Sequence, residues 1–96
     1  LGARQFDTVV ADLPWALLVG TRRENEALYP ALLAEAARVA APGATLALIT
    51  ASHRVFEEAL ARGGGRWVPE ATYPLRVPWE RGYLEPRIHV LRRAED

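Results

Sequence analysis

The apolar residues of this 96-residue chain fall in short runs that alternate between strand and helix spacing. Phe6–Asp12 is apolar and β-branched at its centre, which predicts a buried strand. Residues 26–39 place apolar side chains three and four positions apart, which predicts a helix with one buried face. That face is expected to hold Leu28, Leu32, Ala36 and Val39, with Tyr29, Leu33 and Ala37 beside it.

The rest of the chain continues the alternation. Residues 45–50 predict a short buried strand, 53–62 a helix, 66–77 a long strand, 78–84 a hairpin loop and 85–92 a returning strand. A strand, a helix and a second strand in this order predict a right-handed unit with parallel strands. The fold class is therefore α/β, in the order β-α-β-α-β-β, with two parallel strands and a terminal antiparallel hairpin.

Proline, glycine and polar residues set the expected element ends. Residues 41–43, Ala-Pro-Gly, are expected to end the first helix, and Ser52 to cap the second. Thr21 with Glu24, or Asn25, offers a cap for the first helix. Pro30 is expected near that helix's first turn, where a missing N–H costs little. Pro69 and Pro74 predict bulges or an edge position for their strand.

Composition narrows the class of protein. Half of the residues are hydrophobic and a quarter are charged, which is typical of a globular domain. The absence of cysteine excludes disulfide and thiolate–zinc chemistry, no ligand cluster predicts a metal, and no apolar run is long enough to span a membrane. The net charge is zero, with arginine as the basic residue throughout, whereas a free-standing nucleic-acid binder is usually basic.

The candidate chemistry lies where the first strand ends, in Asp12-Leu13-Pro14-Trp15. Pro14 cannot continue a central strand, so a carboxylate, a backbone carbonyl and an indole are held just past the strand's carboxyl end, where α/β sheets bind ligands. Asp12 and the Leu13 carbonyl can orient the N–H bonds of a base amine for methylation, and Trp15 can stack on a flipped-out base. The alternative is an ordinary strand end with a core tryptophan.

Further candidates have a structural alternative beside the functional one. Arg22 and Arg23 can contact phosphates or form a solvated surface pair. Trp79 and Tyr83 can offer a second stacking surface or cover the hairpin. For three others the structural interpretation is favoured: Tyr29 as a core residue, His53 as a solvent-facing residue at a helix start, and His89 as a strand residue facing outward.

The order of motifs resembles the catalytic half of the THUMP-associated RNA methyltransferases. The resemblance is carried by Asp12-Leu13-Pro14-Trp15, Val19-Gly20-Thr21, Asn25, Leu28-Tyr29-Pro30, Glu35, Arg38-Val39 and Pro42-Gly43. It implies a class I, Rossmann-like domain that uses S-adenosylmethionine to methylate guanine N2, typically in tRNA, in the cytoplasm. It assigns catalysis to Asp12, Leu13, Pro14 and Trp15, cofactor contact to Asp12 and Leu13, and substrate contact to Trp15, Arg22, Arg23, Trp79 and Tyr83.

Two departures from the family pattern favour a non-catalytic interpretation. Ala16 replaces the family's glycine, and Leu17-Leu18 replaces basic residues. The glycine-rich cofactor turn and the RNA-binding module are missing, so residues 1–96 are expected to form one partial domain, the C-terminal half of a methyltransferase domain, inactive alone. The alternatives are a non-catalytic scaffold or dimerisation module, with self-association of the fragment, or an amino-methyltransferase acting on rRNA or DNA.

Overall fold

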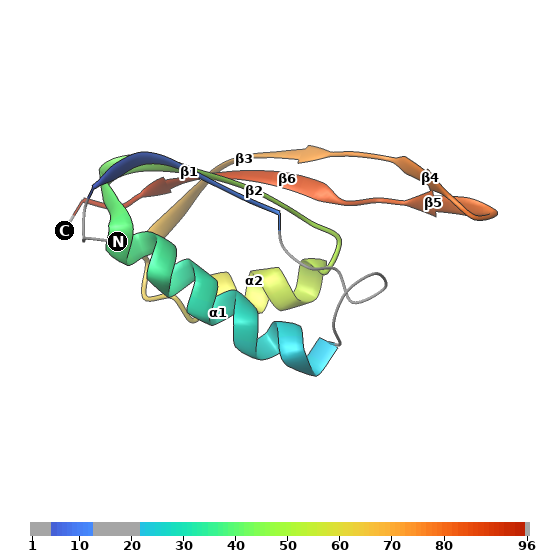
Figure 1. The fold of residues 1–96 in the computed structure, drawn as a ribbon, viewed down its shortest axis with the longest axis horizontal. Helices are drawn as coiled ribbons and strands as arrows, with labels where there is room; N and C mark the ends of the chain where they lie inside the picture. The colour runs from blue at the N-terminus through green and yellow to red at the C-terminus, as the bar shows by residue number, and fades with distance from the viewer. Residues whose placement is uncertain (1–4, 13–21, 96) are drawn as a thin grey trace.

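The computed structural model describes residues 5–12 and 22–95 as six strands and two helices (Figure 1). In chain order these are β1 (Phe6–Asp12), α1 (Arg22–Val39), β2 (Ala40–Thr50), α2 (His53–Ala61), β3 (Trp67–Pro74), β4 (Val77–Trp79), β5 (Gly82–Leu84) and β6 (Arg87–Arg93). The predicted alternation of strands and helices is confirmed. The two short strands β4 and β5 fall in the segment expected to be only a loop.

Four strands form one mixed sheet in the order β1-β2-β6-β3. β1 and β2 run parallel, because α1 carries the chain back between them. β6 enters between β2 and β3 and is antiparallel to both. The parallel pair and the terminal antiparallel pair are thus as predicted, and β1 and β3 are the outer strands of the described sheet.

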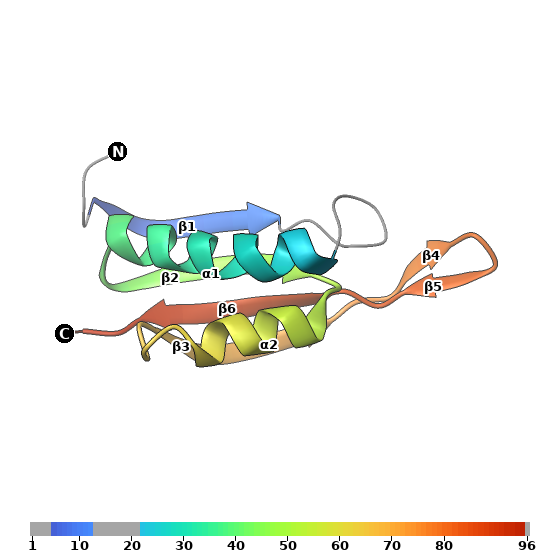
Figure 2. The same ribbon diagram turned by 90° about the horizontal axis from the view of Figure 1, so that it is seen from below.

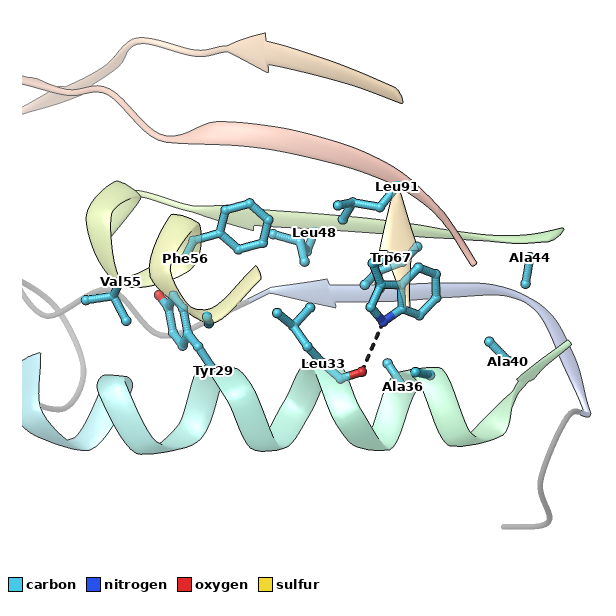
Figure 3. Close-up of a cluster of buried hydrophobic side chains, with 13 residues drawn as sticks. Tyr29, Leu33, Ala36, Ala40, Ala44, Leu48, Val55, Phe56, Trp67 and Leu91 are labelled. Carbon is cyan, nitrogen blue, oxygen red and sulfur yellow. Dashed lines mark hydrogen bonds between the residues drawn. The ribbon is translucent and has the colours of Figure 1, made fainter. Parts of the chain in front are cut away.

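Both helices lie on the same face of the sheet (Figures 1 and 2). In the view of Figure 2, α1 runs over β1 and β2, and α2 runs over β6 and β3. The core lies between these layers, where Leu33 of α1, Phe56 of α2 and Leu48 of β2 are buried (Figure 3). Burial of such side chains, about 1.5–3 kcal/mol each, is the main favourable term that holds the layers together.

The opposite face of the sheet carries no helix within the described residues. Alternate residues of each strand point to it, and the pairing aligns Val10, Ala47, Val90 and Ala71 in one row across the four strands. Val10 is 77% exposed. This row is apolar although it faces outward.

The last hairpin extends past the sheet as a two-stranded ribbon (Figure 2). Its pairing runs without a shift from Pro74 opposite Arg87 to Val77 opposite Leu84, and the Leu75 N–H donates to the Pro86 carbonyl at 2.9 Å. A two-residue turn closes the ribbon, in which Glu80 has a φ of 52°. Such turns require positive φ, which costs a non-glycine residue some strain.

Helix α1 starts earlier than expected, at Arg22 rather than near residue 26. Pro30 therefore lies two turns inside the helix, and its first-turn placement was wrong. Asn25 is a buried helical residue and not a cap. Leu28 is 42% exposed, because the buried face is centred one position further on, at Tyr29. The helical spacing alone did not determine whether Leu28 or Tyr29 lies at the centre of the buried face. Packing of the helix against the rest of the molecule determined it.

The boundaries of β2 and α2 also differ from the expectation. β2 begins at Ala40 and not at residue 45, because Phe6 pairs with Ala40 before the register shifts to Thr8 opposite Thr45. Ser52 precedes α2, but its side chain makes no capping hydrogen bond. Instead its N–H donates to the Thr50 hydroxyl at 3.0 Å. In contrast, the expected bulge at Pro69 on an outer strand is confirmed.

His89 was expected to face outward, and this was wrong. It is 8% exposed, stacks on Phe56 with ring centroids 4.2 Å apart, and its Nδ1 lies 3.3 Å from the Thr72 hydroxyl. The reason is topological. β6 is a central strand, so the residues on one of its sides lie under α2.

The burial of His89 predicts a pH-dependent stability. Burial, followed by the charges of Arg87 and His53, lowers the pKa of His89 below its usual value. Below about pH 6.5 His89 binds a proton more readily in the unfolded chain than in the folded chain. The stability that neutral His89 contributes above that pH is therefore lost as the pH falls. Urea unfolding from pH 7.5 to 5 is expected to show a shallower loss of stability in His89→Gln than in the wild type. Equal slopes in the two proteins would contradict it.

Candidate functional site

Asp12 is the last residue of β1, at the sheet edge where the parallel strands end. It pairs with Ile49, one residue before the end of β2. Val9 and Ala11 pack against the core, so alternation directs Asp12 to the helix-free face, and it is exposed. The carboxylate is therefore open to a ligand at the edge where α/β sheets bind them.

A buried hydrogen bond on the helix side of the sheet stabilises this edge. The Tyr29 hydroxyl lies 2.7 Å from the Thr50 hydroxyl, and both residues are fully buried. The Thr50 oxygen also receives the Ser52 N–H. These contacts join α1, the end of β2 and the start of α2 beside Asp12. Tyr29 is thus confirmed as a core residue, and its hydrogen bond to Thr50 stabilises the backbone at the end of β2.

The remaining residues of the strand-end motif, Leu13, Pro14 and Trp15, lie outside the described residues, and so do Ala16, Leu17 and Leu18. Arg22 begins α1, and the described part of it is its backbone. Arg23 is exposed in the first turn of the same helix. Its position at the helix start fits a phosphate contact as well as a solvated pair.

Trp79 and Tyr83 both lie in the ribbon, but they face opposite sides of it. Tyr83 pairs with Pro78, and Trp79 pairs with Gly82, so their side chains alternate. Tyr83 is 61% exposed, and the Arg76 guanidinium lies 5.0 Å from its ring centroid. Trp79 is 44% exposed. Neither aromatic side chain is covered, and the two do not form one joint surface.

A cleft of about 420 Å³ lies where the ribbon leaves the sheet, and of its polar residues only His53 was considered in the sequence analysis. It is lined by His53, Pro74, Leu75, Arg76, Glu85 and Arg87. The His53 Nε2–H donates to the Glu85 carbonyl at 2.9 Å, which ties the start of α2 to the ribbon. His53 is therefore not a solvent-facing residue. The available signal was Arg76, the one charged residue in the otherwise apolar or aromatic segment 73–79.

No three or more histidine or acidic residues of the described part lie close enough to hold a metal ion. Within the same part, neither helix is long and apolar enough to cross a membrane.

Comparison with solved structures identifies the fold. The chain superposes on TrmN from Thermus thermophilus with a TM-score of 0.74 and 23% identity, over 94% of this chain and 24% of that one. It superposes on SMU.776, solved in complex with SAH, with a TM-score of 0.58 and 11% identity, over 93% and 26% of the two chains. At this identity the likeness concerns the fold, and the Rossmann-like methyltransferase fold is confirmed.

The chain belongs to the RMKL-like methyltransferase domain family, whose sequence profile matches residues 1–78. Two curated relatives are named tRNA (guanine(6)-N(2))-methyltransferase THUMP3. The cattle protein is 33% identical over 92% of this chain, and the mouse protein is 34% identical over 98% of it. The chain spans 17% and 18% of these relatives. The resemblance to THUMP-associated methyltransferases, noted from the motifs, is confirmed.

Proposed function

We propose that this chain is part of an S-adenosylmethionine-dependent RNA methyltransferase that methylates an exocyclic base amine, guanine N2 in tRNA. The observation that carries the proposal is the exposed Asp12 carboxylate at the carboxyl end of β1, in a chain of this family. The substrate comes from the curated relatives, whose name specifies guanine N2 of tRNA. The four strands of the main sheet are assigned to the second half of the methyltransferase sheet.

Each residue of the strand-end motif has a role in this proposal. A base amine is a poor nucleophile, because its lone pair is delocalised into the ring. Asp12 and the Leu13 carbonyl accept its N–H hydrogen bonds and so direct the lone pair at the methyl carbon. Pro14 sets the turn that brings the two acceptors together, and Trp15 stacks on the base, a contact worth about 1–3 kcal/mol. Alignment supplies most of the rate.

The hydrogen-bond acceptors at this edge are compatible with the cofactor. A carboxylate at the end of a parallel strand lies where α/β sheets hold their ligands, and we assign cofactor contact to Asp12 and Leu13. When bound, S-adenosylmethionine supplies an electrophilic methyl, and its sulfur keeps the electron pair of the broken bond. The amine nitrogen forms the new N–C bond, and its surplus proton passes to water.

RNA is the proposed macromolecular partner, and the cytoplasm is the proposed compartment. Arg22 and Arg23 at the start of α1 are assigned to backbone phosphates, which attract arginine regardless of sequence. Trp79 and Tyr83 are assigned to base stacking on the two sides of the ribbon, supported by their exposure. The same motif chemistry would serve a base amine in rRNA or DNA.

A second candidate function is a non-catalytic module that associates through its sheet. The outward row of Val10, Ala47, Val90 and Ala71 favours it, since exposed apolar patches often mark interfaces. Among the described residues, β1 has a neighbouring strand on one side only, so the backbone groups on its other side can pair with a second chain. Self-association of the 96-residue chain stays a prediction.

A transfer assay tests the proposed function. The full-length gene product is incubated with methyl-labelled S-adenosylmethionine and an unmodified tRNA transcript pool, and the nucleosides are separated by mass after digestion. We expect label in N2-methylguanosine. A matched rRNA fragment and a single-stranded DNA serve as competing substrates. Label in another nucleoside, or transfer to the rRNA or DNA alone, would contradict the proposed substrate, and no transfer would favour the non-catalytic module.

A further inference from the structure

We propose that the cleft at the base of the ribbon binds one nucleotide of the RNA strand next to the target base. The base stacks on Tyr83 beside Arg76, and the phosphate lies between Arg76 and Arg87. This inference rests on the proposed function and adds to it a strand-binding site. It involves residues outside the strand-end motif.

The alternation along the ribbon gathers its polar residues on one side. From Tyr73 to Trp79 the odd positions are apolar, and the pairing places Leu84, Pro86 and Ile88 with them. Arg76, Tyr83, Glu85 and Arg87 occupy the other side. Because His53 of α2 lines the cleft together with Arg76 and Arg87, the polar side is the one that faces the helices.

The stacking surface is already assembled. The Arg76 guanidinium lies over the Tyr83 ring, with 5.0 Å to the centroid, while Tyr83 is 61% exposed. A guanidinium and a phenol side by side can both stack on a base, and stacking on an aromatic ring tolerates any base. Tyr83 does not belong to the buried core cluster, so its exposed ring is available to a base.

The two arginines are held by exchangeable partners. Arg76 Nη2 lies 3.1 Å from Glu85 Oε1, and Arg87 Nη1 lies 3.6 Å from Glu57 Oε1. All four side chains are 40% exposed or more, so each pair contributes little to stability. A phosphate can therefore replace either carboxylate, which then turns into water. The start of α2, which has no acidic residue in its first turn, adds a favourable dipole at the same place.

The cleft lies within reach of the target site. Arg87 is opposite Thr50 in the pairing, and Asp12 is opposite Ile49. Arg87 and Asp12 thus lie at the same sheet edge, two strand spacings or roughly 10 Å apart across the sheet. The Asp12 side chain is on the helix-free face and the cleft is on the helix side, so an RNA strand whose target base is at Asp12 passes around this sheet edge to place a neighbouring nucleotide in the cleft.

The test compares two double variants of the full-length gene product with equal loss of charge. Arg76→Ala/Arg87→Ala removes the proposed contacts, whereas Arg62→Ala/Arg66→Ala removes two exposed arginines at the far end of α2 and the start of β3. Binding of a fluorescein-labelled tRNA transcript is followed by anisotropy from 50 to 200 mM salt. Circular dichroism confirms that both variants are folded.

The cleft variant is expected to raise Kd by about ten- to a hundredfold and to reduce the slope of log K against log salt by about 0.7–0.9, as the loss of one neutralised phosphate requires. Tyr83→Ala is expected to raise Kd about tenfold with the slope unchanged, since stacking releases no counterions. The control variant should differ from the wild type by less than threefold.

The outcomes separate the two levels of inference. If the wild type binds and methylates tRNA but both double variants bind alike, the cleft proposal is wrong and the proposed function stands. If the wild type neither binds nor methylates RNA, the function fails, and the cleft proposal with it. Binding of single-stranded DNA but not of tRNA would overturn the assignment of the cleft to RNA.

Discussion

Asp12→Ala in the full-length gene product is expected to lower kcat for methyl transfer by about 10²–10³-fold, the cost of removing one oriented hydrogen-bonding group at a reacting centre. The affinity for S-adenosylmethionine should fall much less, because the carboxylate is only one of several contacts that a cofactor of that size makes. Single-turnover transfer to tRNA measures the rate, and isothermal calorimetry measures the cofactor affinity.

Two further substitutions separate orientation from charge. Asp12→Asn keeps one acceptor oxygen on a side chain of the same size, so it is expected to retain more activity than alanine, with a loss of about tenfold. Asp7→Ala is the matched control, since Asp7 is an exposed aspartate of the same strand near its other end. It should leave kcat within twofold. A fully active Asp12→Ala enzyme would exclude the assigned role.

Trp67→Ala is expected to lower the free energy of unfolding by about 3–5 kcal/mol, the usual cost of removing a buried tryptophan. Trp67 is 5% exposed in the core between α1 and the sheet, and its Nε1–H donates to the Leu33 carbonyl at 3.0 Å (Figure 3). A domain of this size has about 5–10 kcal/mol in total. Urea unfolding of the 96-residue chain, followed by far-ultraviolet circular dichroism, measures the change.

The aromatic residues of the chain supply the controls. Trp67→Phe keeps most of the packing but loses the indole hydrogen bond, so we expect a smaller loss of about 1–2 kcal/mol. Trp79→Ala removes the same side chain from an exposed position of the ribbon and should change stability by less than 1 kcal/mol. If Trp67→Ala and Trp79→Ala destabilise the chain equally, Trp67 does not have the core role described here.

Local signals were sufficient for most of the element order. The β-branched run before Asp12 and the helical spacing after residue 26 depend on neighbours in sequence, and each gave an element of the predicted type. Pro42 and Gly43, which were expected to end the helix in a turn, lie inside β2 instead. The bulge at Pro69 followed from the missing proline N–H, which excludes regular pairing. The strand-end motif likewise placed Asp12 at the sheet edge where ligands bind.

Features that depend on distant partners were misjudged or missed. The expectation that His89 faces outward is an example. The alternation along the strand indicates which residues share a side with His89, but not which side α2 covers. The buried face of α1 is centred on Tyr29, whose hydroxyl is hydrogen-bonded to the hydroxyl of Thr50, 21 residues away. Ser52 precedes α2 without a side-chain capping bond, while its N–H donates to the same Thr50 hydroxyl.

The sequence by itself determined the alternation of strands and helices, the carboxylate at the end of β1 and the likeness to a methyltransferase family, because these depend on residue type and short-range order. Only the tertiary structure decided which face of the sheet stays bare, which side of the ribbon Tyr83 faces, and that Arg76 and Arg87 meet His53 in one cleft. Those results require strand register and helix placement, and both arise from contacts between residues far apart in the chain.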